Sequence, residues 1–330
     1  MLKKIFLALI ALAAVLGCTV VTKANPPLQL GLPIACTLGK DCFVLLYPDR
    51  DPGPGAVDFG CGRMTYDGHS GTDFAIPDEQ VMKQGVSVKS VATGKVLRIR
   101  DGVPDLRQKN PNQREEVQGF ECGNGVVIEH GKGWETQYCH LRQGSVAVKP
   151  GDSVTQDTVL GKVGMSGMAS FPHLHLTVRY QGKVVDPFVG LEEKPGCQVP
   201  RQPLWESSLS YIPTGLIRAG FAQQPPEIDE IWAGKFYEET LPATSPALVF
   251  WIQTYGVLQG DVEQIQLIAP DGKAVVNQSR KLKAPNRIWL SYIGKKATSQ
   301  SLVTGRWQGK YQLTRGDKIL IDEQQQLLLQ

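Results

Sequence analysis

Four of the five histidines in this 330-residue chain fall into three short segments that could build one metal site. The segments read His69-Ser-Gly-Thr-Asp73, Tyr138-Cys-His140-Leu141 and His173-Leu-His175. Neutral imidazole is a common zinc ligand, and a carboxylate often completes the ligand set. A catalytic zinc site typically has three protein ligands and one open position. The first segment would supply two ligands and the last segment a third, which leaves two histidines for acid–base work.

The sequence around these segments predicts β-strands. Asp73 is followed by the apolar run Phe-Ala-Ile, and His175 is followed by an alternating Leu-Thr-Val-Arg-Tyr. Side chains alternate between the two faces of a strand, so His69 and Asp73, four residues apart, can share a face. His173 and His175 can share a face for the same reason. Each of these two histidines could bind the metal, or one could bind it while the other acts on the substrate.

Taken together, the three segments resemble the signature of the lysostaphin-type zinc metallopeptidases, which cut peptide cross-bridges in bacterial peptidoglycan. That family carries His-x-Gly-x-Asp, a later Tyr-x-His-Leu and a closing His-Leu-His, and all three patterns are present here in order. Flanking sequence also matches at residues 124–130, 148–154 and 185–187. The resemblance covers residues 58–188.

The resemblance implies a role for each site residue. His69, Asp73 and His175 would ligate Zn2+. His140 and His173 would be the catalytic histidines. The implied reaction is amide hydrolysis by a metal-activated water, with histidine moving protons to and from the reacting groups. A His-Glu-x-x-His helix is absent from the sequence, so a glutamate base of that kind is not available, and the division of labour between the two histidines stays open.

Two alternatives remain open, and one of them belongs to another functional class. A relative that keeps the fold but has lost the metal could be a non-catalytic wall-binding regulator of other cell-wall hydrolases. Such a loss would normally show as substituted ligands, and none is substituted here. A peptidase acting on another exported protein is a further option. The polar stretch at residues 100–121, rich in charge, Gln and Asn, is predicted to be an inserted loop that shapes substrate choice.

Several polar residues near the motifs are expected to be structural. His130 precedes a Gly-Lys-Gly turn and lies outside the three segments. Asp186, directly before a proline, is predicted to form a turn. Tyr66 and Tyr138 could help stabilise a tetrahedral oxyanion, but packing roles are at least as well supported.

The N-terminus resembles an export signal covering residues 1–24. A basic start is followed by an apolar run from Ile5 to Gly17, which is too short to span a bilayer. Cleavage after Ala24 would release the protein into the periplasm or the extracellular space. A competing lipoprotein-like box ends at Cys18, and membrane attachment is expected only if that cysteine is lipidated. Leu16 fits this box poorly, which favours release.

Cysteine usage also indicates an oxidising compartment. Without Cys18, six cysteines remain, which suits three disulfides. Cys36 and Cys42 are close in sequence and are predicted to pair. Cys122 and Cys139 flank predicted neighbouring strands and form a second candidate pair. The side chain of Cys139 should face away from that of His140, so a nucleophilic role is disfavoured.

Charge excludes one class of partner. The formal net charge is +3, and three lysines leave with residues 1–24, so the remaining protein is close to neutral. A nucleic-acid-binding protein would be expected to carry a basic stripe. Peptidoglycan peptide stems are the expected substrate instead.

The predicted fold class is all-β, with an antiparallel β-sheet peptidase domain and a C-terminal β-sandwich domain. Residues 25–200 would form the peptidase domain, and the Pro-rich residues 201–230 a linker and the start of a second module. Residues 231–330 contain apolar runs separated by turn signals, typical of a sandwich. Gly305–Leu313 resembles the late strand of immunoglobulin-like modules. This module would be a spacer or would dock on a glycan or a partner protein, and its tryptophans are expected to be core: Trp251, Trp289 and Trp307.

Overall fold

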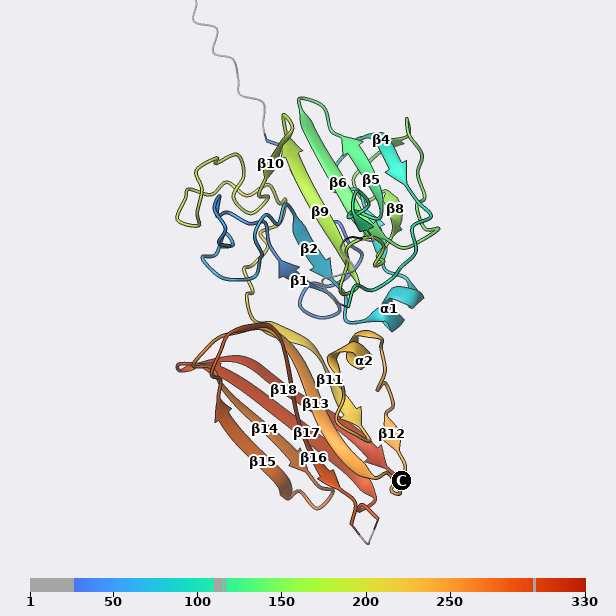
Figure 1. Cartoon of the computed structure of the whole chain (residues 1–330), viewed down its shortest axis with the longest axis vertical. Coiled ribbons are helices and arrows are strands. Elements are labelled where there is room, and N and C mark those ends of the chain that lie inside the picture. Colours follow the sequence, from blue (N-terminus) through green and yellow to red (C-terminus); the bar gives the residue numbers. More distant parts are fainter. Residues whose placement is uncertain (1–26, 110–114, 116, 299–300) are drawn as a thin grey trace, which may run out of the picture.

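The computed structural model describes residues 27–109, 115, 117–298 and 301–330. These residues form two β-rich regions stacked end to end, an N-terminal region (residues 27–213) and a C-terminal region (residues 214–330) (Figure 1). The expected signal at residues 1–24, with Cys18, lies outside the described residues. In the part of the chain that is described, no helix has both the length and the apolar character needed to cross a membrane.

The N-terminal region consists of short strands and one helix, in the order β1 (Phe43–Leu46), β2 (Thr72–Ala75), α1 (Glu79–Gln84), β3 (Ser87–Lys89), β4 (Gly94–Arg100), β5 (Asn124–Glu129), β6 (Trp134–Leu141), β7 (Ser153–Val154), β8 (Val159–Lys162), β9 (His173–Tyr180) and β10 (Lys183–Val185). One antiparallel sheet has the order β1-β2-β9-β6-β5-β4-β7, with β10 paired to β9. A separate ladder joins β3 and β8. The strands that carry the three motifs are therefore neighbours.

Strand β9 shows why the motifs share one side of this sheet. Leu174 and Leu176 are fully buried in the hydrophobic core. The residues between and around them, His173, His175 and Thr177, belong to the opposite face because side chains alternate along a strand. Pairing then places His175 opposite Asp73 on β2. The apolar face fixes the register, and the register fixes which polar residues meet.

One local expectation needs correction. His69 does not lie on a strand with Asp73, because the strand begins at Thr72 and His69 belongs to the preceding irregular segment. The two side chains meet because the chain turns between Ser70 and Thr72, so face-sharing along one extended strand is the wrong reason for their proximity.

Three disulfides pair all six cysteines of the described residues. The predicted pairs Cys36–Cys42 and Cys122–Cys139 are confirmed. The third bond joins Cys61 to Cys197, 136 residues apart, and ties the segment before the first histidine motif to the end of the region. With these sulfurs bonded to one another, none is left as a thiolate ligand for a metal.

The C-terminal region follows in the order β11 (Gly215–Ala222), α2 (Ile228–Trp232), β12 (Thr240–Leu241), β13 (Ala247–Val257), β14 (Val262–Ile268), β15 (Ala274–Lys281), β16 (Asn286–Lys296), β17 (Gly305–Arg315) and β18 (Lys318–Leu329). One sheet has the order β11-β13-β16 and the other the order β12-β18-β17-β14-β15. The pairs are antiparallel except β12 with β18. Strand β11 lies within residues 201–230, where a linker and the start of a module were expected.

Apolar residues from both C-terminal sheets share one core. Phe250 of β13 packs in the same cluster as Leu267 of β14 and Trp307 of β17. Trp251 and Trp307 are buried as expected, whereas Trp289 is half-buried and donates a hydrogen bond through its indole N–H. The two sheets therefore cover each other as layers of a sandwich.

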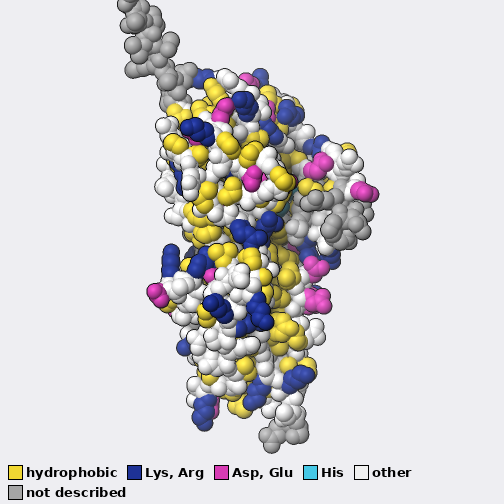
Figure 2. All heavy atoms as spheres, turned by 60° about the vertical axis from the view of Figure 1, so that its left-hand side comes forward, with side chains coloured by type: hydrophobic (Ala, Val, Ile, Leu, Met, Phe, Trp, Pro, Cys, Tyr) yellow, Lys and Arg dark blue, Asp and Glu magenta, His cyan; other side chains and the backbone are white. Residues whose placement is uncertain are grey.

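The two regions are packed against each other. Ile217, Trp232 and Tyr255 of the C-terminal region belong to the hydrophobic core of the N-terminal region. The ring of Tyr255 stacks on Phe43, with ring centroids 5.2 Å apart. Lys and Arg side chains gather on the surface around the waist between the regions (Figure 2). A shared core of this kind makes the relative placement of the regions part of the fold.

Candidate metal centre

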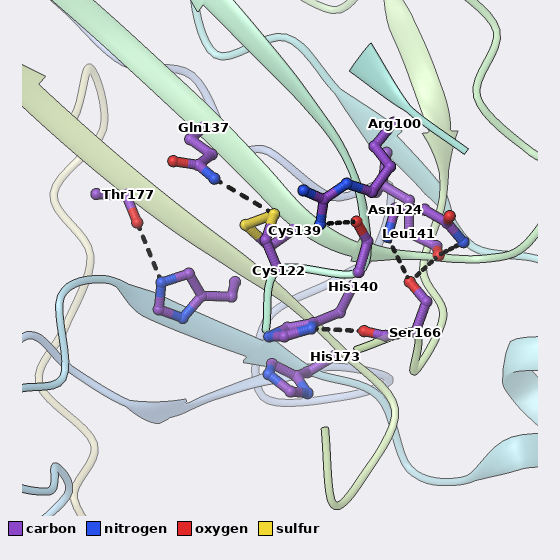
Figure 3. Close-up of a disulfide and its surroundings, with 12 residues drawn as sticks. Arg100, Cys122, Asn124, Gln137, Cys139, His140, Leu141, Ser166, His173 and Thr177 are labelled. Atoms are coloured by element: carbon purple, nitrogen blue, oxygen red, sulfur yellow. Dashed lines mark hydrogen bonds between the residues drawn. A yellow bond between two sulfur atoms is a disulfide. The ribbon is translucent and has the colours of Figure 1, made fainter. Parts of the chain in front are cut away.

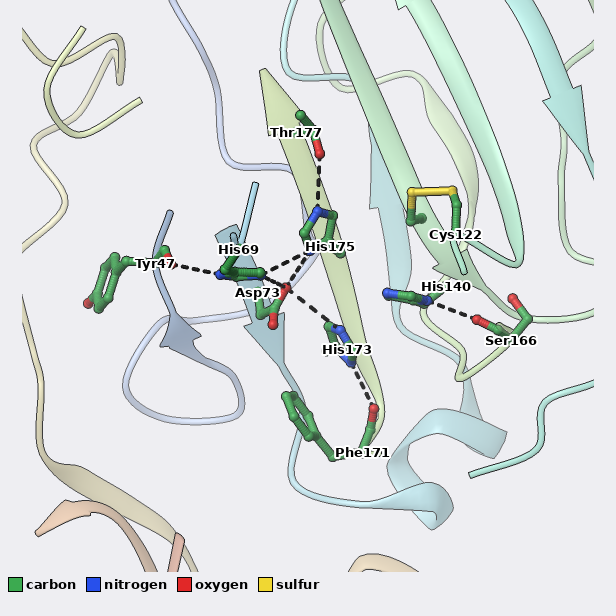
Figure 4. A network of polar contacts seen from close by, with 11 residues as sticks. Tyr47, His69, Asp73, Cys122, His140, Ser166, Phe171, His173, His175 and Thr177 are labelled. Atoms are coloured by element: carbon green, nitrogen blue, oxygen red, sulfur yellow. Dashed lines mark hydrogen bonds and ion pairs between the residues drawn. A yellow bond between two sulfur atoms is a disulfide. The ribbon is translucent and has the colours of Figure 1, made fainter. Parts of the chain in front are cut away.

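Three side-chain atoms converge over strands β2 and β9 of the main sheet. Nε2 of His69 lies 3.2 Å from Oδ1 of Asp73 and 3.2 Å from Nδ1 of His175 (Figure 4). The Asp73 oxygen lies 2.8 Å from the same His175 nitrogen. A tetrahedral ion with bonds of about 2.0 Å spaces its ligand atoms about 3.3 Å apart. The three atoms therefore form one face of a coordination shell of the right size for zinc.

Each of the two imidazoles turns its other nitrogen to an oxygen partner. Nδ1 of His69 donates to the backbone carbonyl of Tyr47 at 2.7 Å. Nε2 of His175 lies 3.1 Å from the hydroxyl of Thr177. Such partners fix the ring orientation and the tautomer of a metal-ligating histidine. The sequence did not identify these partners, although the period of two from His175 to Thr177 could have indicated the second.

The remaining two histidines lie beside this group. Nδ1 of His140 donates to the carbonyl of Ser166 at 2.8 Å (Figure 3). Nδ1 of His173 donates to the carbonyl of Phe171, also at 2.8 Å. The two rings are 4.6 Å apart between centroids. In both, the donated proton sits on Nδ1, which leaves the lone pair on Nε2 free to accept a proton.

The backbone at His140 has an uncommon conformation. Its φ is 61°, in the left-handed region. The register between β5 and β6 shifts between Asn124 and Val126, so the β6 strand bulges at this point. The backbone N–H of His140 donates to the carbonyl of Cys122, whose sulfur is bonded to Cys139. A left-handed residue other than glycine costs ~1–2 kcal/mol, and here the disulfide and the bulge hold it in place.

Electrostatics favour a bound cation at the three converging atoms. Burial alone would raise the pKa of Asp73, but His69, His173 and His175 outweigh it and hold that pKa well below its usual range. Burial opposes protonation of His69, yet the Asp73 carboxylate raises the pKa of that imidazole. The carboxylate is thus ionised at neutral pH in a buried position, and a buried charge requires a compensating positive charge.

The other two histidines are electrically neutral. Burial, and then the neighbouring His173 and His175, lower the pKa of His140 well below its ordinary value. Burial also lowers the pKa of His173. At pH 7 both rings are therefore unprotonated, which is the state that a general base needs.

A groove of about 600 Å³ opens over these residues. Asp73, His140, His173 and His175 line it. Tyr66 also lines it, and its ring lies 4.5 Å from that of His69. A concave site of this size suits a small-molecule or peptide ligand.

All five residues singled out from the sequence meet at this site, whereas His130, Asp186 and Tyr138 have structural roles elsewhere. His130 is hydrogen-bonded to the carbonyl of Thr93 and the hydroxyl of Thr136. Asp186 forms the predicted turn by accepting from the N–H of Phe188. Tyr138 is fully buried and its hydroxyl is used inside the core, so the suggested oxyanion role is wrong for this tyrosine.

Comparisons with known proteins agree on the N-terminal region. Residues 67–187 match the model of peptidase family M23. The peptidoglycan DD-endopeptidase ShyB of Vibrio cholerae is 33% identical over 118 residues, which is 36% of this chain and 22% of ShyB. The DD-carboxypeptidase/endopeptidase Mpg of Neisseria meningitidis is 34% identical over 119 residues, again 36% of this chain and 22% of the relative. The chain thus spans less than a quarter of the length of these curated relatives.

Solved structures also match part of the chain. A zinc-containing peptidase from Vibrio cholerae is 26% identical and covers 44% of this chain and 39% of its own, with a TM-score of 0.28. The catalytic domain of lysostaphin from Staphylococcus simulans is 22% identical and covers 42% of this chain and 85% of its own, with a TM-score of 0.28.

Proposed function

We propose, from the M23 peptidase domain that residues 67–187 form, that this protein is a zinc-dependent endopeptidase that hydrolyses peptide cross-bridges of bacterial peptidoglycan. The observation that carries the proposal is the meeting of a His-Asp-His ligand set with two neutral histidines at one groove. The substrate class follows from ShyB, whose name describes a peptidoglycan DD-endopeptidase, and Mpg is likewise named an endopeptidase.

His69, Asp73 and His175 would hold the zinc ion, which when bound polarises a carbonyl oxygen and activates water for attack. His140 and His173 supply the proton transfers. Their unprotonated Nε2 atoms are suited to take a proton from the attacking water and to pass it to the leaving amine. The buried surroundings keep both rings neutral, so that each begins the reaction able to accept.

The three disulfides are consistent with export to the cell envelope. We propose that residues 1–24 are a signal removed after Ala24, and that the protein acts in the periplasm or outside the cell. Residues 25–200 would be the peptidase unit and residues 231–330 an immunoglobulin-like sandwich that docks on a glycan or a protein. The common core of the two C-terminal sheets supports the sandwich.

The proposal is tested by zinc content and by release of soluble fragments from isolated peptidoglycan, with and without EDTA. We expect about one zinc per chain and cleavage at peptide bonds that EDTA abolishes. His130→Ala is the matched control, because it removes a histidine outside the site and should change neither result. Bound zinc without cleavage would refute the substrate, and neither zinc nor cleavage would favour a non-catalytic regulator.

A further inference from the structure

The groove over the candidate metal centre is not built by the peptidase domain alone. Residues of the C-terminal region line it together with the site histidines, namely Ile228, Asp229 and Trp232 from α2 and Arg287 and Ile288 from β16. Helix α2 lies at the junction, directly across from α1 (Figure 1). One wall of the site therefore belongs to a region that the family match does not include.

Two groups of polar contacts, centred on Arg107 and Asp78, join the two regions beside this wall. The Arg107 guanidinium donates to Glu79 at 3.0 Å and to the side chain and backbone carbonyl of Asp229, so it joins α1 to α2. Asp78, which caps α1 and is fully buried, is bonded to Arg218 and Tyr237 of the C-terminal region. Breaking a buried charged contact leaves an uncompensated charge, so the junction resists opening.

Only one side chain, that of Phe171, separates this wall from the candidate catalytic residue His173. Trp232 stacks on Phe171, with ring centroids 5.5 Å apart and planes inclined by 27°. Phe171 in turn lies 4.4 Å from the ring of His173 and accepts its Nδ1 proton through the backbone carbonyl. Trp232 and His173 therefore line the same groove.

Arg287 gives the wall a charge that the protein does not neutralise. Its Nε donates to the backbone carbonyl of Arg63 at 3.4 Å. Within the described residues, no carboxylate lies at ion-pair distance from Arg287 or Arg63. Arg107 differs, because its guanidinium already forms ion pairs with Glu79 and Asp229. Burial lowers the pKa of Arg287 and the positive charge of Arg63 lowers it further, as expected for a cation that lacks a counter-ion.

We propose that Arg287 is a specificity-determining residue that binds a carboxylate of the peptide substrate, in a subsite whose apolar wall is Trp232 and Ile288. Arginine presents a planar set of donors that matches a carboxylate, and such a charge-assisted pair is stronger than a neutral hydrogen bond. This proposal rests on the proposed peptidase function. It gives the C-terminal region a direct part in choosing the substrate.

The test uses the full chain and two cross-linked peptides that differ only in having free or amidated carboxylates. We expect the unaltered protein to prefer the free carboxylates by about tenfold in kcat/KM, the effect of one charged hydrogen bond. Arg287→Gln should abolish this preference by raising KM for the carboxylate peptide, with kcat unchanged. Arg287→Lys should retain part of it. Arg306→Gln is the matched control, because it removes an exposed arginine of the same region outside the groove.

Peptide binding separates this subsite from the peptidase function. Both peptides are titrated by fluorescence anisotropy against His140→Ala and against His140→Ala with Arg287→Gln. Tighter binding of the carboxylate peptide that disappears with Arg287→Gln supports the subsite, whether or not the unaltered protein cleaves it. Equal binding of the two peptides to His140→Ala, or an equal loss for both with Arg287→Gln, overturns it. Failure of the unaltered protein to cleave either peptide is instead a failure of the proposed reaction.

Discussion

Each of the two regions buries a carboxylate, and the two carboxylates have opposite surroundings. Glu263 in the C-terminal region is fully buried and is bonded to Arg280, Trp289, Ser291 and Tyr311. Every one of these partners is a donor to it, so both carboxylate oxygens are satisfied within the protein.

Asp73 in the peptidase domain has histidines in place of these donors. A neutral imidazole has only one N–H, and His69, like His173, donates that proton to a backbone carbonyl. Imidazole nitrogens with lone pairs therefore face the negatively charged carboxylate of Asp73. A buried acid whose oxygens are satisfied by protein donors indicates a structural role, whereas converging acceptors are suited to hold a cation.

The largest expected effects come from removing the histidines that surround Asp73. His175→Ala removes a proposed ligand and should abolish both zinc binding and turnover. His140→Ala should keep most of the zinc and lower kcat by at least about 1,000-fold, because only proton transfer is lost. Metal analysis and peptidoglycan digestion give the two readouts. Equal loss of metal from both variants would contradict the assigned roles.

Glu263→Ala tests whether the buried carboxylate of the C-terminal region has only a structural role. It leaves buried donors of Trp289 and Tyr311 without a partner, so the free energy of unfolding should fall by about 4 kcal/mol. Zinc affinity should not change. Urea denaturation measures the first quantity and metal titration the second. Glu239→Ala, an exposed glutamate of the same region, is the control and should be close to neutral.

A sharper comparison uses two disulfides within the peptidase region. Replacing Cys122 and Cys139 with serine should lower stability by about 3 kcal/mol, since the bond closes a loop with a sequence separation of 17. Activity should fall as well, because His140 loses the support of its backbone conformation. The same replacement of Cys36 and Cys42 should leave activity unchanged. Equal activity of the two double variants would show that the bulge holds His140 without its disulfide.

The smallest expected effect concerns a third buried acid, Asp186. Burial raises its pKa from 3.8 to about 6, despite Arg50 at 3.9 Å. Between pH 4 and 6 the folded state therefore keeps a proton on Asp186 that the unfolded state releases. The contribution of this group to the free energy of unfolding is complete below pH 4 and is lost as the pH rises through 6. Asp186→Asn should become more stable relative to the unaltered protein by at most about 3 kcal/mol over that range. Unfolding curves at several pH values measure the difference, and a flat difference would contradict it.

The sequence predicted the site residues better than the long-range contacts that surround them, and the reason is physical. His173 and His175 are placed by the two-residue period of a strand, which is a local property. The contact of His69 with the carbonyl of Tyr47 and the bond from Cys61 to Cys197 depend on distant parts of the chain. The place of Arg287 in the groove depends on the docking of one region on another, and no local pattern carries that information.

The same limit applies to elements of the C-terminal region. Strands β13 and β17 were indicated by apolar residues, and the structure contains them. Strand β15 has almost no buried residue, so alternation of apolar and polar side chains could not indicate it. Strand β11 was concealed in a Pro-rich stretch, because its pairing with β13 is the long-range contact that defines it.

The left-handed backbone of His140 has an evolutionary consequence. Glycine or asparagine adopts this conformation more readily, so His140 is retained against a continuing stability disadvantage. In a lineage released from the need for the proposed hydrolysis, glycine or asparagine at this position would relieve the backbone strain. Loss of Asp73 or His69 would instead disturb a buried network. A protein that kept His69, Asp73 and His175 could therefore lose its proposed acid–base histidine at a gain in stability, while the ligand set still looked intact.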